Sequence, residues 1–184
     1  MQTDRIILEG RRFELTIDRL CHQLIENHDD FQDTCLVGVQ ERGVAFANRF
    51  CDNLKLITKN SSLQYGKLDV TFHRDDFGRR ETPLAASMTE MDFLVEDKKV
   101  VLIDDVLYTG RTIRAALDAL QHFGRPSQVE LLVLVDRRFN RHLPIMADYV
   151  GITVDAVDEA YVKVDWADSQ NQNDKILLFP KKIN

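Results

Sequence analysis

Apolar and polar residues along this chain follow two periods in turn, one typical of helices and one typical of strands. From about Arg11 to Asn27, apolar residues recur at steps of three and four, which predicts an amphipathic helix. The run Thr34–Val39 is apolar and short, which predicts a strand covered on both faces. After Gly43 the helical period returns and continues through Leu54. The first third of the chain therefore predicts a helix–strand–helix sequence.

The same alternation continues through the middle of the chain. Residues 67–74 alternate apolar and polar positions, which predicts a strand with one solvated face, and residues 75–99 have no sustained period, which predicts a loop. A buried strand is predicted at 100–104, a helix at 111–123 and a second buried strand at 128–135. Strands that alternate with helices favour an α/β fold with a mostly parallel, twisted sheet flanked by helices.

Short alternating runs at 161–164 and 175–179 predict further strands near the end of the chain. No linker rich in proline, glycine or serine divides the 184 residues, and 44% of them are apolar, which is enough for a core. We therefore expect one domain over residues 1–184.

Charge and cysteine content narrow the class of protein. No apolar run is long enough to cross a bilayer, and we expect neither a signal peptide nor a membrane partner. Cys21, Cys35 and Cys51 are odd in number and each lies in an apolar pattern, which predicts buried thiols in the cytoplasm. The net charge of −6 disfavours broad affinity for nucleic acid but leaves room for a local basic face.

The stretch "DDVLYTGRT" joins the buried strand at 100–104 to the following helix and holds the candidate chemistry. Parallel sheets bind ligands beyond the carboxyl ends of their strands, where this stretch is expected to lie. Thr109, Gly110 and Thr112 would direct backbone N–H groups and hydroxyls to one space before a helix N-terminus, which suits a phosphate. Asp104 and Asp105 can accept hydrogen bonds from sugar hydroxyls or from water on Mg²⁺. Together these groups favour a phosphorylated sugar, and no dinucleotide or Walker motif is present.

The longer string "VVLIDDVLYTGRT" resembles the motif by which type I phosphoribosyltransferases bind phosphoribosyl diphosphate (PRPP). The ordered blocks "LVGVQERG", "DVTFHRDDF", "GRPSQVELLVLVDRRFNRHLPIMADYVG" and "NQND" are especially similar to the PyrR family, the bifunctional pyrimidine operon regulators and uracil phosphoribosyltransferases. This resemblance implies the type I phosphoribosyltransferase fold, with a hood at about 136–160 and a flexible loop over the site.

The resemblance also implies roles for individual residues. The acidic pair would bind the ribose hydroxyls, and residues 107–112 would hold the 5′-phosphate. The turn Gln40–Gly43 would be the pyrophosphate loop, in which Arg42 donates hydrogen bonds and a cis peptide lies beside it. Many family members have lysine where Gln40 stands. The implied catalytic residues are Arg42, Asp104 and Asp105. The implied PRPP-binding residues are Glu41, Arg42, Gly43, Asp104, Asp105, Val106, Leu107, Tyr108, Thr109, Gly110, Arg111 and Thr112.

Two further segments receive roles from the same resemblance. Arg74, Asp75 and Asp76 would begin the flexible loop, and a solvated position is expected for Arg79 and Arg80, which follow them. Arg137 and Arg138 in the hood would recognise the base. The implied reaction converts uracil and PRPP to UMP and pyrophosphate, with Mg²⁺ carried by the PRPP diphosphate rather than by direct protein ligands. A homo-oligomer is implied as well.

Two alternatives remain open at this point. The chain could act mainly as an RNA-binding attenuator on a pyrimidine mRNA leader, which suits His22 and Arg141. Asp18, Met146 and Ile152 stand where the family is expected to have a small polar residue, arginine and lysine, which favours the enzyme over the regulator. A purine phosphoribosyltransferase is the other alternative, because "ADYVG" is similar to the hood of hypoxanthine enzymes.

Overall fold

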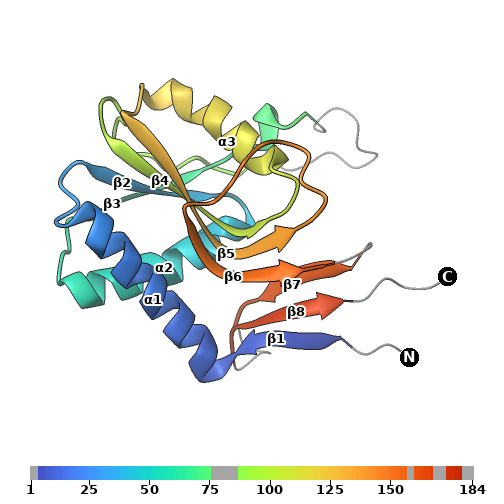
Figure 1. Ribbon diagram of the computed structural model, residues 1–184. Coiled ribbons are helices and arrows are strands. Elements are labelled where there is room, and N and C mark those ends of the chain that lie inside the picture. The colour runs from blue at the N-terminus through green and yellow to red at the C-terminus, as the bar shows by residue number, and fades with distance from the viewer. Residues whose placement is uncertain (1–3, 76–86, 157–159, 168–172, 180–184) are drawn as a thin grey trace.

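The computed structural model describes residues 4–75, 87–156, 160–167 and 173–179 and contains two sheets (Figure 1). The larger sheet is parallel, and its strands lie in the order β3-β2-β4-β5-β6. Their bounds are β2 (Thr34–Val39), β3 (Gln64–Leu68), β4 (Lys99–Leu107), β5 (Gln128–Arg138) and β6 (Tyr149–Asp155). The predicted α/β architecture with a parallel sheet is confirmed.

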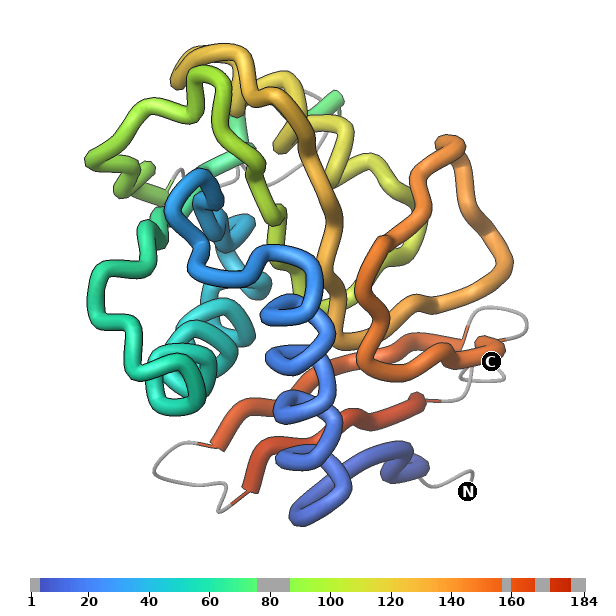
Figure 2. Tube along the Cα trace, turned by 60° about the vertical axis from the view of Figure 1, so that its left-hand side comes forward, coloured from blue at the N-terminus to red at the C-terminus, as the bar shows by residue number. Residues whose placement is uncertain are grey.

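Helices cover both faces of this sheet. Helices α1 (Gly10–His28) and α2 (Arg42–Thr58) lie on one face, and α3 (Arg111–Leu120) lies on the other, where the short turn η2 (Gln121–Phe123) continues it. The second sheet is antiparallel, with strand order β1-β8-β7. It contains β1 (Arg5–Glu9), β7 (Tyr161–Asp165) and β8 (Lys175–Phe179). Figure 2 shows blue β1 beside red β8, so segments from both ends of the chain form one small sheet.

Strand β4 shows why the central strands are apolar without interruption. Val101 and Ile103 pack with the core under α1 and α2, while Val100 and Leu102 pack with the core under α3. All four side chains are fully buried, because successive residues of a strand point to opposite faces and both faces are covered. This packing fixes the carboxyl end of β4, where the candidate site lies.

Segment 67–74 differs from its predicted strand. Strand β3 ends at Leu68, and residues Thr71–His73 form a short 3₁₀ turn, η1, in which Phe72 is 68% exposed. The Asp69 carboxylate explains the change, because it accepts hydrogen bonds from the backbone N–H and the hydroxyl of Thr71, at 3.0 and 2.6 Å. Such local side-chain bonds stabilise turns in competition with strand pairing.

Other element boundaries also differ from the predictions. The strand predicted at 100–104 continues to Leu107, and the strand predicted at 128–135 continues to Arg138. Strands β1 and β6 were not predicted, and β6 occupies part of the segment assigned to a hood. Helix α3 ends at Leu120 rather than at 123.

The cysteine prediction is confirmed in its structural part. Cys21, Cys35 and Cys51 are all buried and unpaired, and burial raises the pKa of the Cys21 thiol to about 12. Among the described residues, no helix is long and apolar enough to span a membrane.

Candidate active site at the carboxyl end of the parallel sheet

A pocket of about 400 Å³ opens beyond the carboxyl ends of β2 and β4. This is the location that the sequence predicts for a ligand in a parallel sheet. The small antiparallel sheet also contributes to the pocket, through two residues of β7. The lining residues are Gln40, Glu41, Arg42, Val70, Thr71, Arg74, Asp104, Asp105, Val106, Tyr108, Thr112, Tyr161 and Val162.

The two adjacent carboxylates lie within β4 rather than beyond its end, which corrects the predicted boundary. Asp104 and Asp105 are each 6% exposed, and the Asp105 backbone N–H donates to Asp104 Oδ1 at 2.9 Å. Burial raises the pKa of both carboxyl groups, and the neighbouring Asp105 raises the pKa of Asp104 further. The Arg42 guanidinium and the Val106 backbone N–H partly offset the rise in the pKa of Asp105. Burial of two adjacent acids without a ligand makes their ionised forms unfavourable, and such perturbed groups are typical of functional sites.

Helix α3 begins beside this pair with a glycine turn. Gly110 has a φ of +88°, which favours glycine, and the Arg114 N–H donates to its carbonyl at 3.0 Å to start the helix. Tyr108 and Thr112 line the pocket. The Thr109 carbonyl instead accepts the backbone N–H of His142 at 3.0 Å, which ties the turn to the connection after β5. The N-terminus of a ten-residue helix thus lies at the pocket, as anion binding requires.

The turn between β2 and α2 forms the opposite wall. The Gln40–Glu41 peptide is cis, as the resemblance implied, and both side chains line the pocket. Gln40 Nε2 donates to the Met88 carbonyl at 2.5 Å. A Cβ atom at Gly43 would lie 2.8 Å from both Asp104 Oδ1 and the Ile103 carbonyl oxygen, so only glycine lets α2 start this close to β4.

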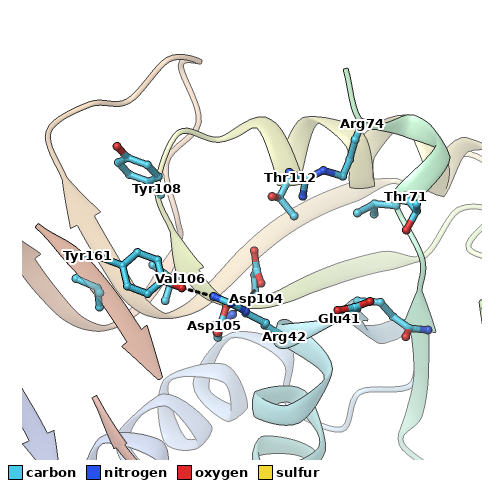
Figure 3. A pocket seen from close by; sticks show the side chains of 13 residues that line it. Glu41, Arg42, Thr71, Arg74, Asp104, Asp105, Val106, Tyr108, Thr112 and Tyr161 are labelled. Atoms are coloured by element: carbon cyan, nitrogen blue, oxygen red, sulfur yellow. Dashed lines mark hydrogen bonds between the residues drawn. The ribbon is translucent and has the colours of Figure 1, made fainter. Parts of the chain in front are cut away.

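Arg42 is the first residue of α2, and its side chain lies beside the carboxylates in Figure 3. Its Nη1 donates to the hydroxyl of Tyr161, the first residue of β7. This hydrogen bond, together with the nearby charge of Asp105, raises the pKa of Arg42. Sequence reasoning missed Tyr161, because nothing in the sequence relates two residues that lie 119 positions apart.

The predicted flexible loop is only partly described. Arg74 lines the pocket, and its charge lowers the pKa of Asp104. Asp75 pairs with Arg111 at the start of α3, away from the pocket lining. Asp76, Arg79 and Arg80 lie outside the described residues. Thr71 reaches the pocket through the η1 turn, a contact that the strand prediction for 67–74 did not foresee.

The two hood arginines lie in different environments. The Arg137 guanidinium carbon is 3.8 Å from the centre of the Tyr108 ring, and this arginine is 5% exposed. Its Nε is buried without an acceptor among the described residues. Arg138 instead makes two hydrogen bonds to the Asp155 carboxylate, at 2.6 and 2.7 Å. Neither arginine is among the residues that line the pocket, so base recognition stays a prediction.

The two candidate RNA residues, His22 and Arg141, lie on different segments of the chain. His22 is exposed on α1. Arg141 donates to Asp136 Oδ1 at 2.5 Å and to the Tyr108 carbonyl, so it braces the connection after β5 against the α3 turn. Asp18 accepts a hydrogen bond from Asn53 at 2.7 Å, and Met146 is 85% exposed.

The chain is similar in sequence to known phosphoribosyltransferases. The family profile described as a phosphoribosyl transferase domain matches residues 5–169. The Bifunctional protein PyrR of Elusimicrobium minutum (strain Pei191) is 45% identical over 148 residues, which are 80% of this chain and 82% of that protein. The Bifunctional protein PyrR of Bacillus cereus (strain B4264) is 37% identical over 184 residues, covering 98% of this chain and 100% of that protein.

Solved structures support the fold at lower identity. The hypoxanthine phosphoribosyltransferase of Trypanosoma cruzi has a TM-score of 0.70 at 16% identity, covering 96% of this chain and 97% of that one. A hypoxanthine phosphoribosyltransferase from Staphylococcus aureus has a TM-score of 0.62 at 19% identity, covering 82% and 77%. These similarities confirm the type I phosphoribosyltransferase fold. With the identities above, they show that the chain belongs to the PyrR family of phosphoribosyltransferases.

Proposed function

We propose that this protein transfers the phosphoribosyl group of PRPP to uracil, giving UMP and pyrophosphate. The observation that carries the proposal is one pocket in which a buried acid pair, an arginine and a helix N-terminus meet. Acceptors for sugar hydroxyls and donors for two phosphate groups are thereby close together. The identity of 37–45% to proteins named PyrR favours a pyrimidine as the acceptor.

In the proposed reaction the bond between ribose C1 and the diphosphate oxygen breaks as a bond from C1 to uracil N1 forms. The proton on N1 leaves to solvent, and pyrophosphate departs with the bonding electron pair. Asp104 and Asp105 accept hydrogen bonds from the ribose hydroxyls and fix the sugar while positive charge develops at C1. Arg42 and Arg74 stabilise negative charge on the departing group, and the amides at the start of α3 hold the 5′-phosphate.

Mg²⁺ fits this donor set. When bound to the PRPP diphosphate it would supply charge neutralisation on the leaving group. Asp104, Asp105 and Glu41 carry carboxylates at the pocket, and they can accept hydrogen bonds from its coordinated waters. We propose that the ion enters with PRPP.

The assignment of the base is tested by measuring pyrophosphate release with uracil, hypoxanthine and guanine side by side, at equal PRPP and Mg²⁺. We expect turnover with uracil and at most background rates with both purines. The purine alternative rests on similarity of the hood segment and on solved hypoxanthine enzymes below 20% identity, which supports the fold alone. Turnover of hypoxanthine without turnover of uracil would reverse the assignment.

RNA binding is the second candidate function, and the name of the relatives, Bifunctional protein PyrR, favours it. We rank it below the enzyme because Arg141 is already paired with Asp136, while Asp18 adds negative charge to α1 near His22. A gel shift with pyrimidine leader RNA at two salt concentrations, with and without UMP, tests this ranking. We expect weak binding with little response to UMP. Saturable, salt-sensitive binding enhanced by UMP would show that RNA recognition is retained.

A further inference from the structure

We propose that Tyr161 is a positioning residue that holds the Arg42 guanidinium away from Asp105, so that both remain available to PRPP. This inference rests on the proposed phosphoribosyl transfer and assigns a part of it to the small antiparallel sheet. The hydrogen bond from Arg42 Nη1 to the Tyr161 hydroxyl joins α2 to β7 beside the acid pair (Figure 3). Both residues line the pocket together with Asp105.

Without a positioning residue, the charges in the pocket would favour a direct ion pair between Arg42 and Asp105. Arg42 is close enough to Asp105 that each shifts the pKa of the other. Among the described residues, no ion pair within 4.0 Å joins Arg42 to either carboxylate of the acid pair. An arginine beside a carboxylate that is 6% exposed has a strong tendency to pair with it, because screening by water is weak there.

Direct pairing would obstruct the site. An Asp105 carboxylate engaged by arginine has fewer lone pairs left for ribose hydroxyls, and the paired guanidinium has fewer N–H groups left for the diphosphate. PRPP would have to break the ion pair before it could bind. The Tyr161 hydroxyl oxygen is a neutral acceptor for Arg42. A hydrogen bond to it is weaker than one to a carboxylate, so a phosphate oxygen of PRPP can replace it more easily.

Tyr161 is 43% exposed, but it belongs to a paired strand that packed elements hold in place. Tyr161 pairs with Phe179 across β7 and β8, and the two ring centres are 6.3 Å apart. Just beyond β7, the ring of Trp166 stacks on Phe46 of α2 at 6.2 Å. The Arg49 guanidinium of α2 lies 4.7 Å from the same indole.

Arg49 also ties α2 to the segments that flank β7 and β8. It donates to the Ala167 carbonyl at 3.2 Å and to the Asp174 carboxylate at 2.7 Å. Arg42 and Arg49 belong to the same helix, so these contacts fix β7 relative to the helix that carries Arg42. These contacts therefore hold the strand that carries Tyr161 close to the start of α2.

The test compares Tyr161→Phe with the matched control Tyr65→Phe. Each substitution removes one hydroxyl, and Tyr65 lies on β3 outside the pocket lining, where its hydroxyl donates to Asn48 at 2.8 Å. We expect the KM for PRPP of Tyr161→Phe to rise about tenfold, because loss of a hydrogen bond to a charged group changes binding by at least about this factor. The kcat should stay within about threefold of the parent. Tyr65→Phe should leave both constants unchanged. An unchanged KM for PRPP in Tyr161→Phe would overturn the inference.

A double-mutant cycle separates positioning from a general structural effect. In the Arg42→Ala background there is no guanidinium left to position, so Tyr161→Phe should add almost no further loss. If the two losses instead multiply, Tyr161 acts independently of Arg42 and the inference is wrong.

Binding of Mg²⁺-PRPP without a base, measured by calorimetry, keeps the inference separate from the proposed function. Weaker PRPP binding by Tyr161→Phe supports the inference even if uracil is not turned over, in which case only the base assignment fails. Uracil turnover by the parent with equal PRPP binding in both proteins overturns the inference and leaves the function in place. Absence of PRPP binding by the parent would overturn both.

Discussion

Replacing Arg42 with alanine is expected to lower kcat/KM for PRPP about 10²–10³-fold, the loss typical when one preorganised donor to a developing anion is removed. Arg42 begins α2 at the pocket wall, and the charge that it carries lies next to the acid pair. Without it, the departing pyrophosphate would leave beside two carboxylates with less compensation. Steady-state pyrophosphate release at varied PRPP measures the effect.

The control for this prediction is Arg11→Ala. Arg11 also carries one positive charge on a helix, but its ion pair with Glu14 is on the surface, with 72% of the Arg11 side chain exposed. Exposed pairs of this kind contribute little to stability, so this variant should keep parental kcat/KM. Equal activity of Arg42→Ala and the parent would remove Arg42 from the proposed mechanism.

Sequence reasoning was most successful where one local pattern decides the structure. The bounds of β2 were predicted without error, because no polar side chain interrupts the run from Cys35 to Val39 and a turn that contains a glycine follows it. The turn at Gly110 and the start of α3 were also predicted, since turn residues come directly before an apolar helical period. The turn after β2 and the start of α3 both contribute residues to the pocket, so this part of its lining follows from local sequence.

Other elements depend on contacts between distant segments. Strand β1 has charged residues at both ends, and it is a strand because β8 pairs with it. Strand β6 is only partly buried and gave no continuous apolar run, and it forms because β5 extends to Arg138 and offers an edge. The alternating runs at 161–164 and 175–179 did predict the two strands β7 and β8, but the pairing of these strands, which places Tyr161 beside Arg42, has no local sequence signal.

The burial of the acid pair was not predicted, for a related reason. Asp104 and Asp105 are nearly as buried as the apolar residues before them. The start of α2 covers them, and Gly43 permits that approach because a side chain would collide with Asp104. Gly43, in the turn after β2, thus permits the burial of Asp104 and Asp105, which lie 61 and 62 positions further along the chain.

Asp105→Asn is expected to lower kcat/KM about 10²-fold while raising the thermal stability of the empty protein. Two hydrogen bonds from ribose hydroxyls to a charged acceptor contribute about 1.5 kcal/mol each at the low end, which gives this loss. The gain in stability follows from the raised pKa of the pair. A carboxyl group whose pKa is raised in the folded state stabilises the fold at acid pH and loses that contribution as pH rises above its ordinary value of 3.8. At neutral pH the buried Asp105 charge destabilises the fold, so replacing it with a neutral side chain should raise Tm. A higher Tm together with lower activity would exclude misfolding as the cause of the lost activity.

The pH profile gives the second readout for the acid pair. The proposed mechanism needs ionised carboxylates, so kcat/KM should rise with pH along an acid limb that lies above the ordinary carboxyl pKa of 3.8, with the pair titrating as a unit. Because the Arg42 cation lowers the pKa of Asp105, Arg42→Ala should move this limb to higher pH, whereas the Arg11→Ala control should leave it in place. An acid limb at the same pH in all three proteins would mean that the group that limits turnover lies outside the acid pair.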